Sequence, residues 1–219
     1  MKTAKAYKGL PMEGPIAAWY AKITLKDIHR HRLMASQLVK HIPAGGRVLE
    51  IAPGPGYFCL ELAKLGDFQI TGLDISQSFV DIAQKNAAAS GVKAQFRQGD
   101  AANMPFEAES FDFLFCQAAF KNFSQPVEAI AEMYRVLRPG GIGVISDMRS
   151  DASLADIDQE VRGMGLGTIN AFLVRWTFKN MLIKSAYSLS GMKTMVAKTP
   201  FGKCKIDTHG IGFQVWLQK

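Results

Sequence analysis

The sequence predicts an α/β fold built on a doubly wound, mostly parallel sheet, with helices on both faces and an antiparallel hairpin at the C-terminal end. Three observations predict it. Strand-like and helix-like apolar patterns alternate five times between residues 47 and 149, which is typical of βαβ units. A glycine turn, Pro53-Gly54-Pro55-Gly56, separates the first expected strand from the helix that follows. Two short apolar runs joined by Thr208-His-Gly indicate a closing hairpin.

The individual elements follow in chain order. Apolar residues at helical spacing indicate one or two helices over 15–42, which Pro43-Ala-Gly-Gly ends. The expected strands are 47–52, 68–74, 94–97, 111–116 and 142–147. The expected helices between them are 57–65, a helix capped by Ser76 and ended by Gly91, and 126–137. Beyond residue 150 we expect a long helical stretch over about 153–190 and hairpin strands at 203–207 and 211–217.

Composition favours a single domain. The chain has 219 residues, 48% of them hydrophobic, which suffices for one compact core. We expect four parts: an N-terminal helical cap (1–46), a ligand-binding core (47–149), a helical lid over an acceptor (150–200) and the C-terminal hairpin (201–219). The net charge of +7 divides as +6 over 1–46, −3 over 47–149 and +4 over 150–219. Basic flanks suit a nucleic acid, an anionic membrane or an acidic substrate, and they also suit an ordinary solvated surface.

The sequence offers no sign of export or of a metal site. No apolar run is long enough to cross a membrane, and the basic N-terminus lacks the apolar centre of a signal peptide, so we expect a cytoplasmic protein. Cys59, Cys116 and Cys204 are scattered and form no C-x-x-C pair. Neither disulfides nor a metal are therefore expected, and buried free thiols are the simple interpretation.

The glycine turn predicts a ligand at the carboxyl ends of the strands, where open α/β sheets bind theirs. Gly54 and Gly56 allow a ligand to approach the backbone and the start of the following helix. Cys59 stands where the dinucleotide fingerprint has its third glycine, and no Gly-Lys-Ser/Thr follows, so a pyrophosphate loop and a P-loop are both disfavoured. A ligand with a sugar and a charged tail but no phosphate fits better, although a purely structural turn also accounts for the glycines.

Two acids at later strand ends sharpen the prediction. Asp74 ends the second strand, where its carboxylate can accept both hydroxyls of a ribose. Asp100 follows the third strand and can hold an adenine amino group, with the Ala101 N–H reaching a ring nitrogen. Either acid alone also suits a helix cap or a turn. Together with the glycine turn, they lie at the ends of three successive strands, which caps do not explain.

Residues 47–149 resemble the class I S-adenosylmethionine-dependent methyltransferases, in the branch that includes the ubiquinone/menaquinone-biosynthesis C-methyltransferases. The stretches that carry the resemblance are "VLEIAPGPGYFCLELAK", "ITGLDISQSFVDIAQKNA", "FRQGDAANMPFEAESFDFLFCQAAFKNF" and "AIAEMYRVLRPGGIGVISD". The resemblance implies a Rossmann-like sheet and S-adenosylmethionine as cofactor. The cofactor-binding residues that it implies are Glu50, Ala52, Gly54 and Gly56 for the methionine part, Asp74 for the ribose, Asp100 and Ala101 for the adenine, and Gln117 beside the sulfonium, with Ile75 as a further cofactor contact and Tyr20 closing over the cofactor.

The sequence departs from this family at two places. The turn reads A-P-G-P-G where many relatives have G-x-G-x-G, so Ala52 replaces the first glycine and the loop is stiffer. Lys121 and Asn122 stand where many relatives carry a histidine pair, so no histidine base is present at that point. Methyl transfer from a sulfonium needs alignment in a dry crevice, and it needs a base only when the acceptor is protonated. The missing histidines therefore do not exclude activity.

The catalytic candidates are Asp147, after the fifth strand, and Tyr20 on the N-terminal helix. The alternative for Asp147 is a helix cap or an ion pair with Arg149. The chain lacks an Asn/Asp-Pro-Pro-Tyr turn, a Pro-Cys nucleophile and a separate RNA-binding module, which leaves a small or medium organic acceptor. The expected substrate-binding residues are Tyr20, Lys121, Arg149, Arg175, Trp176 and Tyr187.

The lid 150–200 mixes bulky apolar residues with basic ones, which suits an apolar acceptor, or a lipid-like one drawn from a membrane surface. An ordinary core helix with a solvated basic face has the same pattern. Three other functions remain open: an RNA methyltransferase using the basic flanks, a non-catalytic S-adenosylmethionine-binding protein, and an NAD(P)-dependent oxidoreductase, which Cys59 disfavours. The sequence does not predict the oligomeric state.

Overall fold

The computed structural model describes residues 7–8 and 12–219. Part of the predicted N-terminal cap, residues 1–6 and 9–11, lies outside the described residues. Seven strands form one sheet in the order β3-β2-β1-β4-β5-β7-β6, and β1 to β5 run parallel while β7 pairs antiparallel with β5 and with β6. The predicted fold class is therefore confirmed. The strands are β1 (Arg47–Ile51), β2 (Gln69–Asp74), β3 (Ala94–Gln98), β4 (Phe111–Gln117), β5 (Leu137–Met148), β6 (Lys205–His209) and β7 (Gly212–Gln218).

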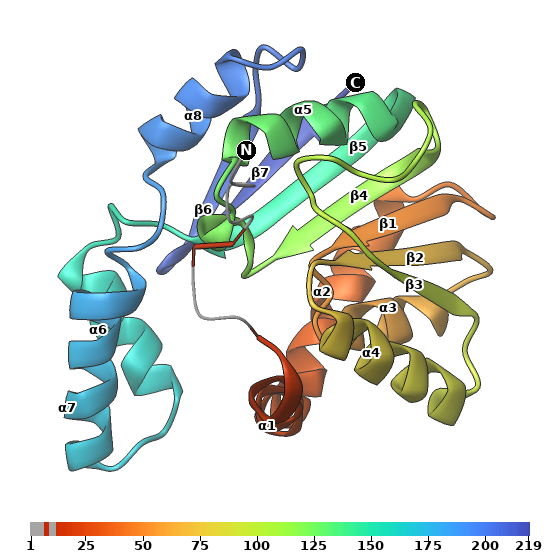
Figure 1. Ribbon diagram of the computed structural model, residues 1–219. Helices are drawn as coiled ribbons and strands as arrows, with labels where there is room; N and C mark the ends of the chain where they lie inside the picture. The colour runs from red at the N-terminus through yellow and green to blue at the C-terminus, as the bar shows by residue number, and fades with distance from the viewer. Residues whose placement is uncertain (1–6, 9–11) are drawn as a thin grey trace, which may run out of the picture.

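Helices cover both faces of the sheet (Figure 1). One face packs against α2 (Ile28–Leu38), α3 (Tyr57–Ala63) and α4 (Gln77–Ser90), and the other against α5 (Pro126–Val136) and α8 (Leu189–Ala197). Alternate residues of each central strand enter opposite layers: Val48 belongs to the α2–α4 layer and Leu49 to the α5–α8 layer. Burying these two apolar layers is the main source of stability.

Local signals set most of the element ends. The Ser76 side chain caps α4 by accepting a hydrogen bond of 3.1 Å from Phe79 N, and Gly91 ends the helix with a φ of +67°. The strand β5 is longer than the sequence predicts, because it begins at Leu137, directly after α5. Its first residues pair with β4 across a register shift, so Arg138-Pro-Gly-Gly141 is an irregular strand segment and not only a helix stop.

The long helical stretch predicted over about 153–190 is divided into several shorter helices. The region after residue 150 contains α6 (Leu154–Gly163), α7 (Thr168–Thr177), a π-helix (Phe178–Leu182) and α8. Three glycines in the run Gly163-Met-Gly-Leu-Gly167 break the helical path, and Gly165 has a φ of +63°. We call α6, α7 and the π-helix the lobe; it stands apart from the sheet in Figure 1 and has its own small core, formed by Ile157, Val161, Phe178, Ile183 and Ile211.

The N-terminal segment lies across from the lobe at the other side of the strand ends (Figure 1). It forms α1 (Gly14–Thr24) and a 3₁₀ turn (Leu25–Asp27) that leads into α2, and further 3₁₀ turns follow at Val39–His41 and Phe120–Asn122. The start of α1 is tied to the start of α4, because Glu13 accepts hydrogen bonds of 3.1 and 3.0 Å from the amides of Gln77 and Ser78. No helix of the described residues has both the length and the apolar character needed to span a bilayer.

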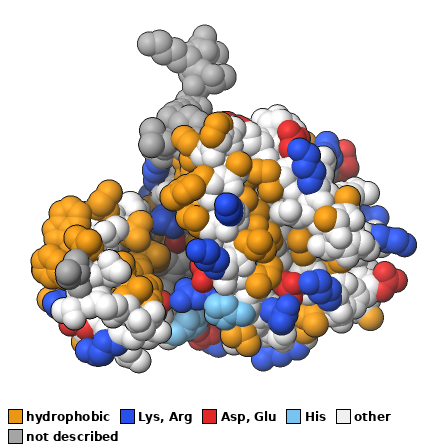
Figure 2. Space-filling view, turned by 90° about the horizontal axis from the view of Figure 1, so that it is seen from below, with side chains coloured by type: hydrophobic (Ala, Val, Ile, Leu, Met, Phe, Trp, Pro, Cys, Tyr) orange, Lys and Arg blue, Asp and Glu red, His pale blue; other side chains and the backbone are white. Residues whose placement is uncertain are grey.

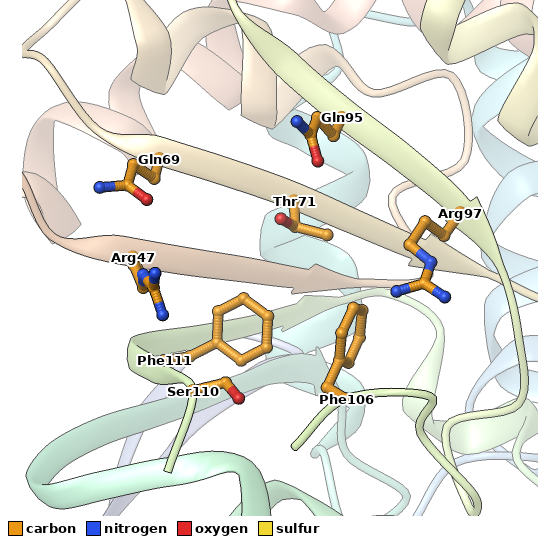
Figure 3. A pocket seen from close by; sticks show the side chains of 8 residues that line it. All are labelled: Arg47, Gln69, Thr71, Gln95, Arg97, Phe106, Ser110 and Phe111. Atoms are coloured by element: carbon orange, nitrogen blue, oxygen red, sulfur yellow. The ribbon is translucent and has the colours of Figure 1, made fainter. Parts of the chain in front are cut away.

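A polar hollow of about 240 Å³ lies on the part of the sheet that no α5 or α8 side chain covers. Figure 3 shows its lining: Arg47, Gln69, Thr71, Gln95 and Arg97 project from β1, β2 and β3 beside Phe106, Ser110 and Phe111. Arg47 and Gln69 are the first residues of their strands. The hollow therefore opens toward the amino ends of the strands, away from the edge where the sequence predicts a ligand.

Candidate functional site

A cavity of about 810 Å³ lies at the carboxyl ends of β1, β2 and β4, between these strand ends and α1. Figure 2 views the molecule from below and shows a hollow between the lobe and the central part of the protein. Ten of the residues predicted from the sequence line this cavity: Tyr20, Glu50, Ala52, Gly54, Asp74, Ile75, Asp100, Ala101, Gln117 and Lys121. The residues that the sequence did not single out include Tyr7, Trp19, Arg30, His31, Tyr57, Phe79 and Phe123.

The glycine turn bends between β1 and α3 and holds its shape through backbone contacts. Ala52, Gly54 and Gly56 have φ angles of +56°, +53° and +81°. Ala52 therefore adopts the left-handed conformation that a glycine would take without strain. Gly56 does not line the cavity. It lies beneath it, where a Cβ would come within 3.0 Å of both Ala83 Cβ and Phe96 Cζ, so this predicted ligand residue has a packing role in the structure.

Asp74 ends β2 with its side chain buried in the cavity wall. Its Oδ2 accepts a hydrogen bond of 3.0 Å from Gly54 N, and its Oδ1 accepts one of 2.9 Å from Ser76 N. Burial raises the pKa of Asp74 to about 6, against the lowering effect of these two bonds. Each oxygen accepts one amide and keeps acceptor capacity for a further donor, which suits the two hydroxyls of a ribose.

Glu50 is the second buried acid of the site and lies one residue before the end of β1. Its Oε2 accepts hydrogen bonds from Cys59 N at 3.2 Å and from Cys59 Sγ at 2.9 Å. Burial raises the pKa of Glu50 to about 7. The cysteine at the third-glycine position therefore holds this carboxyl group in place, a role that the motif comparison did not foresee.

Asp100 and Ala101 bring a third strand end to the cavity. Both follow β3, and Asp100 Oδ1 accepts a hydrogen bond of 2.9 Å from Ala102 N. The turn fixes the carboxyl group while leaving Asp100 half-buried at the cavity wall. Gly54 of the glycine turn, Asp74 and Asp100 thus line one cavity, whereas Gly56 does not, and their roles in binding a ligand stay predictions.

His31 and Gln117 are half-buried in the cavity wall, and each has one buried polar atom there. His31 Nδ1 and Gln117 Oε1 are both buried, and neither has a hydrogen-bond partner of good geometry among the described residues. Burial lowers the pKa of His31, and the nearby Gln117 side chain opposes that shift only in part, so the imidazole is neutral at neutral pH. Buried polar atoms without partners are rare, and at a cavity wall they are available to bind a water molecule or a ligand.

The spacing of polar residues along the N-terminal helices indicates that His31 faces the cavity, whereas the spacing of the apolar residues does not. Tyr20, Thr24, Asp27 and His31 follow one another at intervals of three or four residues, and all four line the cavity. Tyr20 also packs edge-on against Phe79 at 5.8 Å between ring centroids. Burial raises the pKa of Tyr20, so its phenol stays protonated at neutral pH.

Asp147 does not line the cavity, although Lys121 does. The Asp147 carboxylate is buried and accepts hydrogen bonds from Lys121 Nζ at 3.0 Å, from Lys121 N at 3.0 Å and from Met148 N at 2.8 Å. The lysine side chain is itself only 11% exposed. Through these contacts Asp147 holds Lys121 and the 3₁₀ turn Phe120–Asn122 in place. Its catalytic role stays a prediction.

The other expected substrate-binding residues lie outside the cavity. Arg149 pairs with Asp151 and Asp156, and Arg175 pairs with Asp158 at 2.6 Å. Trp176 is exposed on α7. Tyr187 packs against Phe120 and its hydroxyl accepts a hydrogen bond of 2.6 Å from Lys8 Nζ. Of the predicted lid region, Leu182 reaches the cavity wall, whereas α1 supplies most of the cover.

Comparisons with known proteins agree with this geometry. Residues 49–145 match the model of the methyltransferase domain family. Demethylmenaquinone methyltransferase of Deinococcus radiodurans is 36% identical over 123 residues, covering 56% of this chain and 50% of the relative. Phthiotriol/phenolphthiotriol dimycocerosates methyltransferase 1 of Mycobacterium ulcerans is 33% identical over 157 residues, covering 68% of this chain and 57% of the relative. These alignments thus span about half the length of the curated relatives.

Solved structures show the same fold over the whole chain. The crystal structure of a putative S-adenosylmethionine-dependent methyltransferase from Methanococcus maripaludis superposes with a TM-score of 0.75 and 22% sequence identity, covering 100% of this chain and 97% of that one. The family match covers the three strand ends that meet in the cavity, and the buried Asp74 carboxylate suits the ribose of the cofactor. Residues 49–145 are therefore similar to the methyltransferase domain family, and the chain has the Rossmann-like fold of S-adenosylmethionine-dependent methyltransferases, which implies S-adenosylmethionine as the cofactor.

Proposed function

We propose that this chain is an enzyme that moves a methyl group onto a carbon of an apolar, ring-bearing acceptor of the quinol type. One observation carries the proposal: the acidic strand ends that suit the cofactor and the aromatic side chains that suit a ring line the same cavity of about 810 Å³. The likeness to a demethylmenaquinone methyltransferase supports the acceptor class. The aromatic side chains that line the cavity favour an acceptor with a ring over one that is a charged or extended polymer.

The chain's own residues supply binding, orientation and a dry environment. S-adenosylmethionine, when bound, supplies an electrophilic methyl group on a sulfonium sulfur that departs as a neutral thioether. Asp74 would hold the ribose, Asp100 and Ala101 the adenine, and Glu50 with the Ala52–Gly54 backbone the methionine part. Trp19 and Tyr20 cover the cavity from α1 and exclude water from it. Holding the reacting groups in line lowers the activation barrier of a displacement reaction by a large amount.

A quinol acceptor must also lose protons, and His31 is placed to take one. Removal of the hydroxyl proton makes the neighbouring ring carbon nucleophilic. The new C–C bond uses a ring electron pair as the methyl–sulfur bond breaks; the ring carbon then releases its own hydrogen as a proton to water, and the oxygen regains a proton from the imidazolium. The neutral imidazole of His31 can accept the hydroxyl proton at neutral pH. A hydrogen bond from Nδ1 to Gln117 Oε1 would pair both buried orphan atoms and leave Nε2 as the acceptor.

The test is methyl transfer by the purified chain from methyl-labelled S-adenosylmethionine to a reduced, short-chain naphthoquinol. Mass spectrometry and NMR should find one added methyl group on a ring carbon. Catechol, a primary amine and bulk tRNA serve as competing acceptors for oxygen, nitrogen and RNA methylation. Labelling of tRNA or of the amine in preference to the quinol would overturn the acceptor class. Binding of the cofactor without transfer to any acceptor would favour the non-catalytic alternative.

A further inference from the structure

Two segments beside the cavity carry large apolar side chains on the outside of the protein. Phe172, Leu173 and Trp176 of α7 are 67%, 54% and 54% exposed, and Trp19 of α1 is 61% exposed. We call these side chains and their neighbours on the same segments the docking face. It consists of Ile16, Trp19, Ile23 and Leu25 from α1 and the following 3₁₀ turn, and of Phe172, Leu173, Trp176 and Met181 from α7 and the π-helix.

The two segments that carry the docking face border the same cavity. Figure 2 shows hydrophobic side chains gathered over the lobe and over the central part of the protein, with Lys and Arg side chains between them. Ile16 and Trp19 line the cavity from α1, and Leu182 lines it from the π-helix. Buried residues of α6 and the π-helix form a small core together with Ile183 and Ile211, and the exposed side chains of α7 are not part of that core.

The charge of the docking face is strongly positive. Residues 14–30 contain Lys22, Lys26 and Arg30 with one acid, Asp27, and residues 166–185 contain three basic residues and no acid. Arg30 and Arg175 have carboxylate partners in Glu160 and Asp158. Lys22, Lys26, Lys179 and Lys184 are exposed and form no ion pair within the described part of the chain.

We propose that the docking face binds the surface of an anionic phospholipid bilayer, with its aromatic side chains at the level of the headgroups and the cavity mouth turned toward the lipid. Exposed Trp and Phe beside lysines are the composition of helices that lie in a membrane interface. The positive charge selects an anionic lipid surface. The inference rests on the proposed function in one respect: an apolar acceptor dissolved in lipid would enter the cavity from this side.

The experiment uses the full chain and two kinds of vesicle, phosphatidylcholine alone and phosphatidylcholine with phosphatidylglycerol. Co-sedimentation should show binding to the anionic vesicles, with affinity that falls as salt is added. Tryptophan emission should shift to the blue on binding, because Trp19 and Trp176 are exposed in the free protein. Trp216 lies against His41 with 4.8 Å between ring centroids, and its contribution should stay constant.

Two variants test the two components of the docking face. Phe172→Ser with Leu173→Ser removes apolar area, and Lys179→Glu with Lys184→Glu reverses charge. Each lysine near an anionic surface contributes roughly fivefold to partitioning, so we expect each double variant to bind at least about tenfold more weakly. The matched controls are Leu65→Ser for the apolar change and Lys85→Glu with Lys93→Glu for the charge change, all exposed residues around α3 and α4. The controls should bind as the unaltered protein does.

Three results would overturn the inference: no partition to either vesicle, equal losses in the test and control variants, or a dimer in solution that the Phe172→Ser, Leu173→Ser variant dissociates. The last result would assign the docking face to a second copy of the chain. Methylation of a water-soluble quinol separates the two proposals. If vesicle binding is absent while methylation proceeds, the membrane inference fails alone. If vesicle binding holds while no quinol is methylated, the acceptor assignment fails alone.

Discussion

The amide of Gly54 donates a hydrogen bond of 3.0 Å to Oδ2 of Asp74, so the turn after β1 and the acid that ends β2 fix each other. Two motifs twenty residues apart along the chain thereby become one structural unit. The bond orients the carboxylate toward the cavity and uses only part of its acceptor capacity. The proposed ribose site is therefore held in shape by the chain itself, which would reduce the ordering cost of binding.

Replacement of Asp74 by Asn should weaken cofactor binding at least tenfold, or about 1.4 kcal/mol. The Asn amide can accept from only one of the two backbone N–H groups that Asp74 satisfies, and its NH₂ group cannot accept a ribose hydroxyl. Calorimetric titration with S-adenosylmethionine measures the effect. Asp81→Asn, at an exposed position on α4, is the control and should bind normally. Unchanged affinity in Asp74→Asn would remove the ribose assignment.

Two substitutions in the glycine turn, one that adds a methyl group and one that removes a methyl group, should change the free energy of unfolding in different directions. Gly56→Ala should lower the free energy of unfolding by about 2–4 kcal/mol, because φ is +81° and the new Cβ would lie 3.0 Å from Ala83 Cβ and Phe96 Cζ. Ala52→Gly relieves left-handed strain of about 1–2 kcal/mol and loses about 0.5–1 kcal/mol to the freer unfolded chain. It should therefore be neutral or slightly stabilising. Urea unfolding of the two variants decides between this account and a tolerant loop.

The sequence predicted the sheet and most of the strand-end residues that line the cavity because both depend on local signals. Strand alternation, the glycine turn and an acid after a strand are visible within a few residues, and parallel topology brings their ends together. In the sequence, Cys59 is notable only because it replaces the third glycine of the dinucleotide fingerprint. In the structure, its thiol donates a hydrogen bond to the Glu50 carboxyl group. No local pattern shows which carboxyl group a side chain nine positions away will contact.

The acceptor half was predicted less well because it depends on how distant segments pack. Bulky and basic residues in 150–200 suggested a lid, but Arg149 and Arg175 are held by nearby acids and Trp176 faces outward. The cover comes mainly from α1, whose position depends on contacts between Glu13 and the start of α4. His31 was overlooked because helical periodicity was read for apolar residues alone.

Cofactor affinity should rise with pH through the titration of two buried acids. Burial raises the pKa of Glu50 to about 7 and that of Asp74 to about 6, and in the proposed binding mode the ionised forms would accept hydrogen bonds from the cofactor. Affinity should therefore fall at least about tenfold between about pH 8 and pH 5.5, because each pKa unit corresponds to about 1.36 kcal/mol. Titration calorimetry across this range provides the measurement, and Glu50→Gln should lose the upper part of the pH dependence.

For the protein without cofactor, the same two acids predict the opposite trend: their contribution to stability should fall as pH rises. Their pKa values lie above the reference values of 4.5 and 3.8, so the folded state binds more protons than the unfolded state between about pH 4 and pH 7. Their contribution to stability is present at low pH and is lost as pH rises through 6 and 7. The cofactor-induced increase in melting temperature should therefore grow with pH. A constant increase from about pH 5.5 to pH 8 would contradict the raised pKa values.

Asp147→Asn distinguishes a positioning role from a catalytic one. The substitution removes the Asp147 carboxylate and leaves the poorly exposed Lys121 ammonium without a negatively charged partner. Breaking such a buried ion pair costs about 3–5 kcal/mol. The double variant Lys121→Met with Asp147→Leu should recover part of that loss, because no unpaired charge remains. Chemical denaturation measures both. A loss of turnover by about 10²-fold or more in Asp147→Asn, with unfolding unchanged, would instead support the base that the sequence suggested.

His31→Gln should lower turnover by about 10²–10⁴-fold while leaving S-adenosylmethionine affinity unchanged, because the imidazole acts on the acceptor and not on the cofactor. In the unaltered protein, burial holds the pKa of His31 below its reference value of 6.5, so activity should fall as pH drops through that lower pKa, where the imidazole becomes protonated. The variant should lack this acidic limb of the pH–rate profile. His29→Gln, an exposed neighbour on α2, is the control and should keep both rate and profile. If His31→Gln retains the limb, another group removes the acceptor proton, and the unpaired His31 Nδ1 and Gln117 Oε1 serve only to shape the cavity wall.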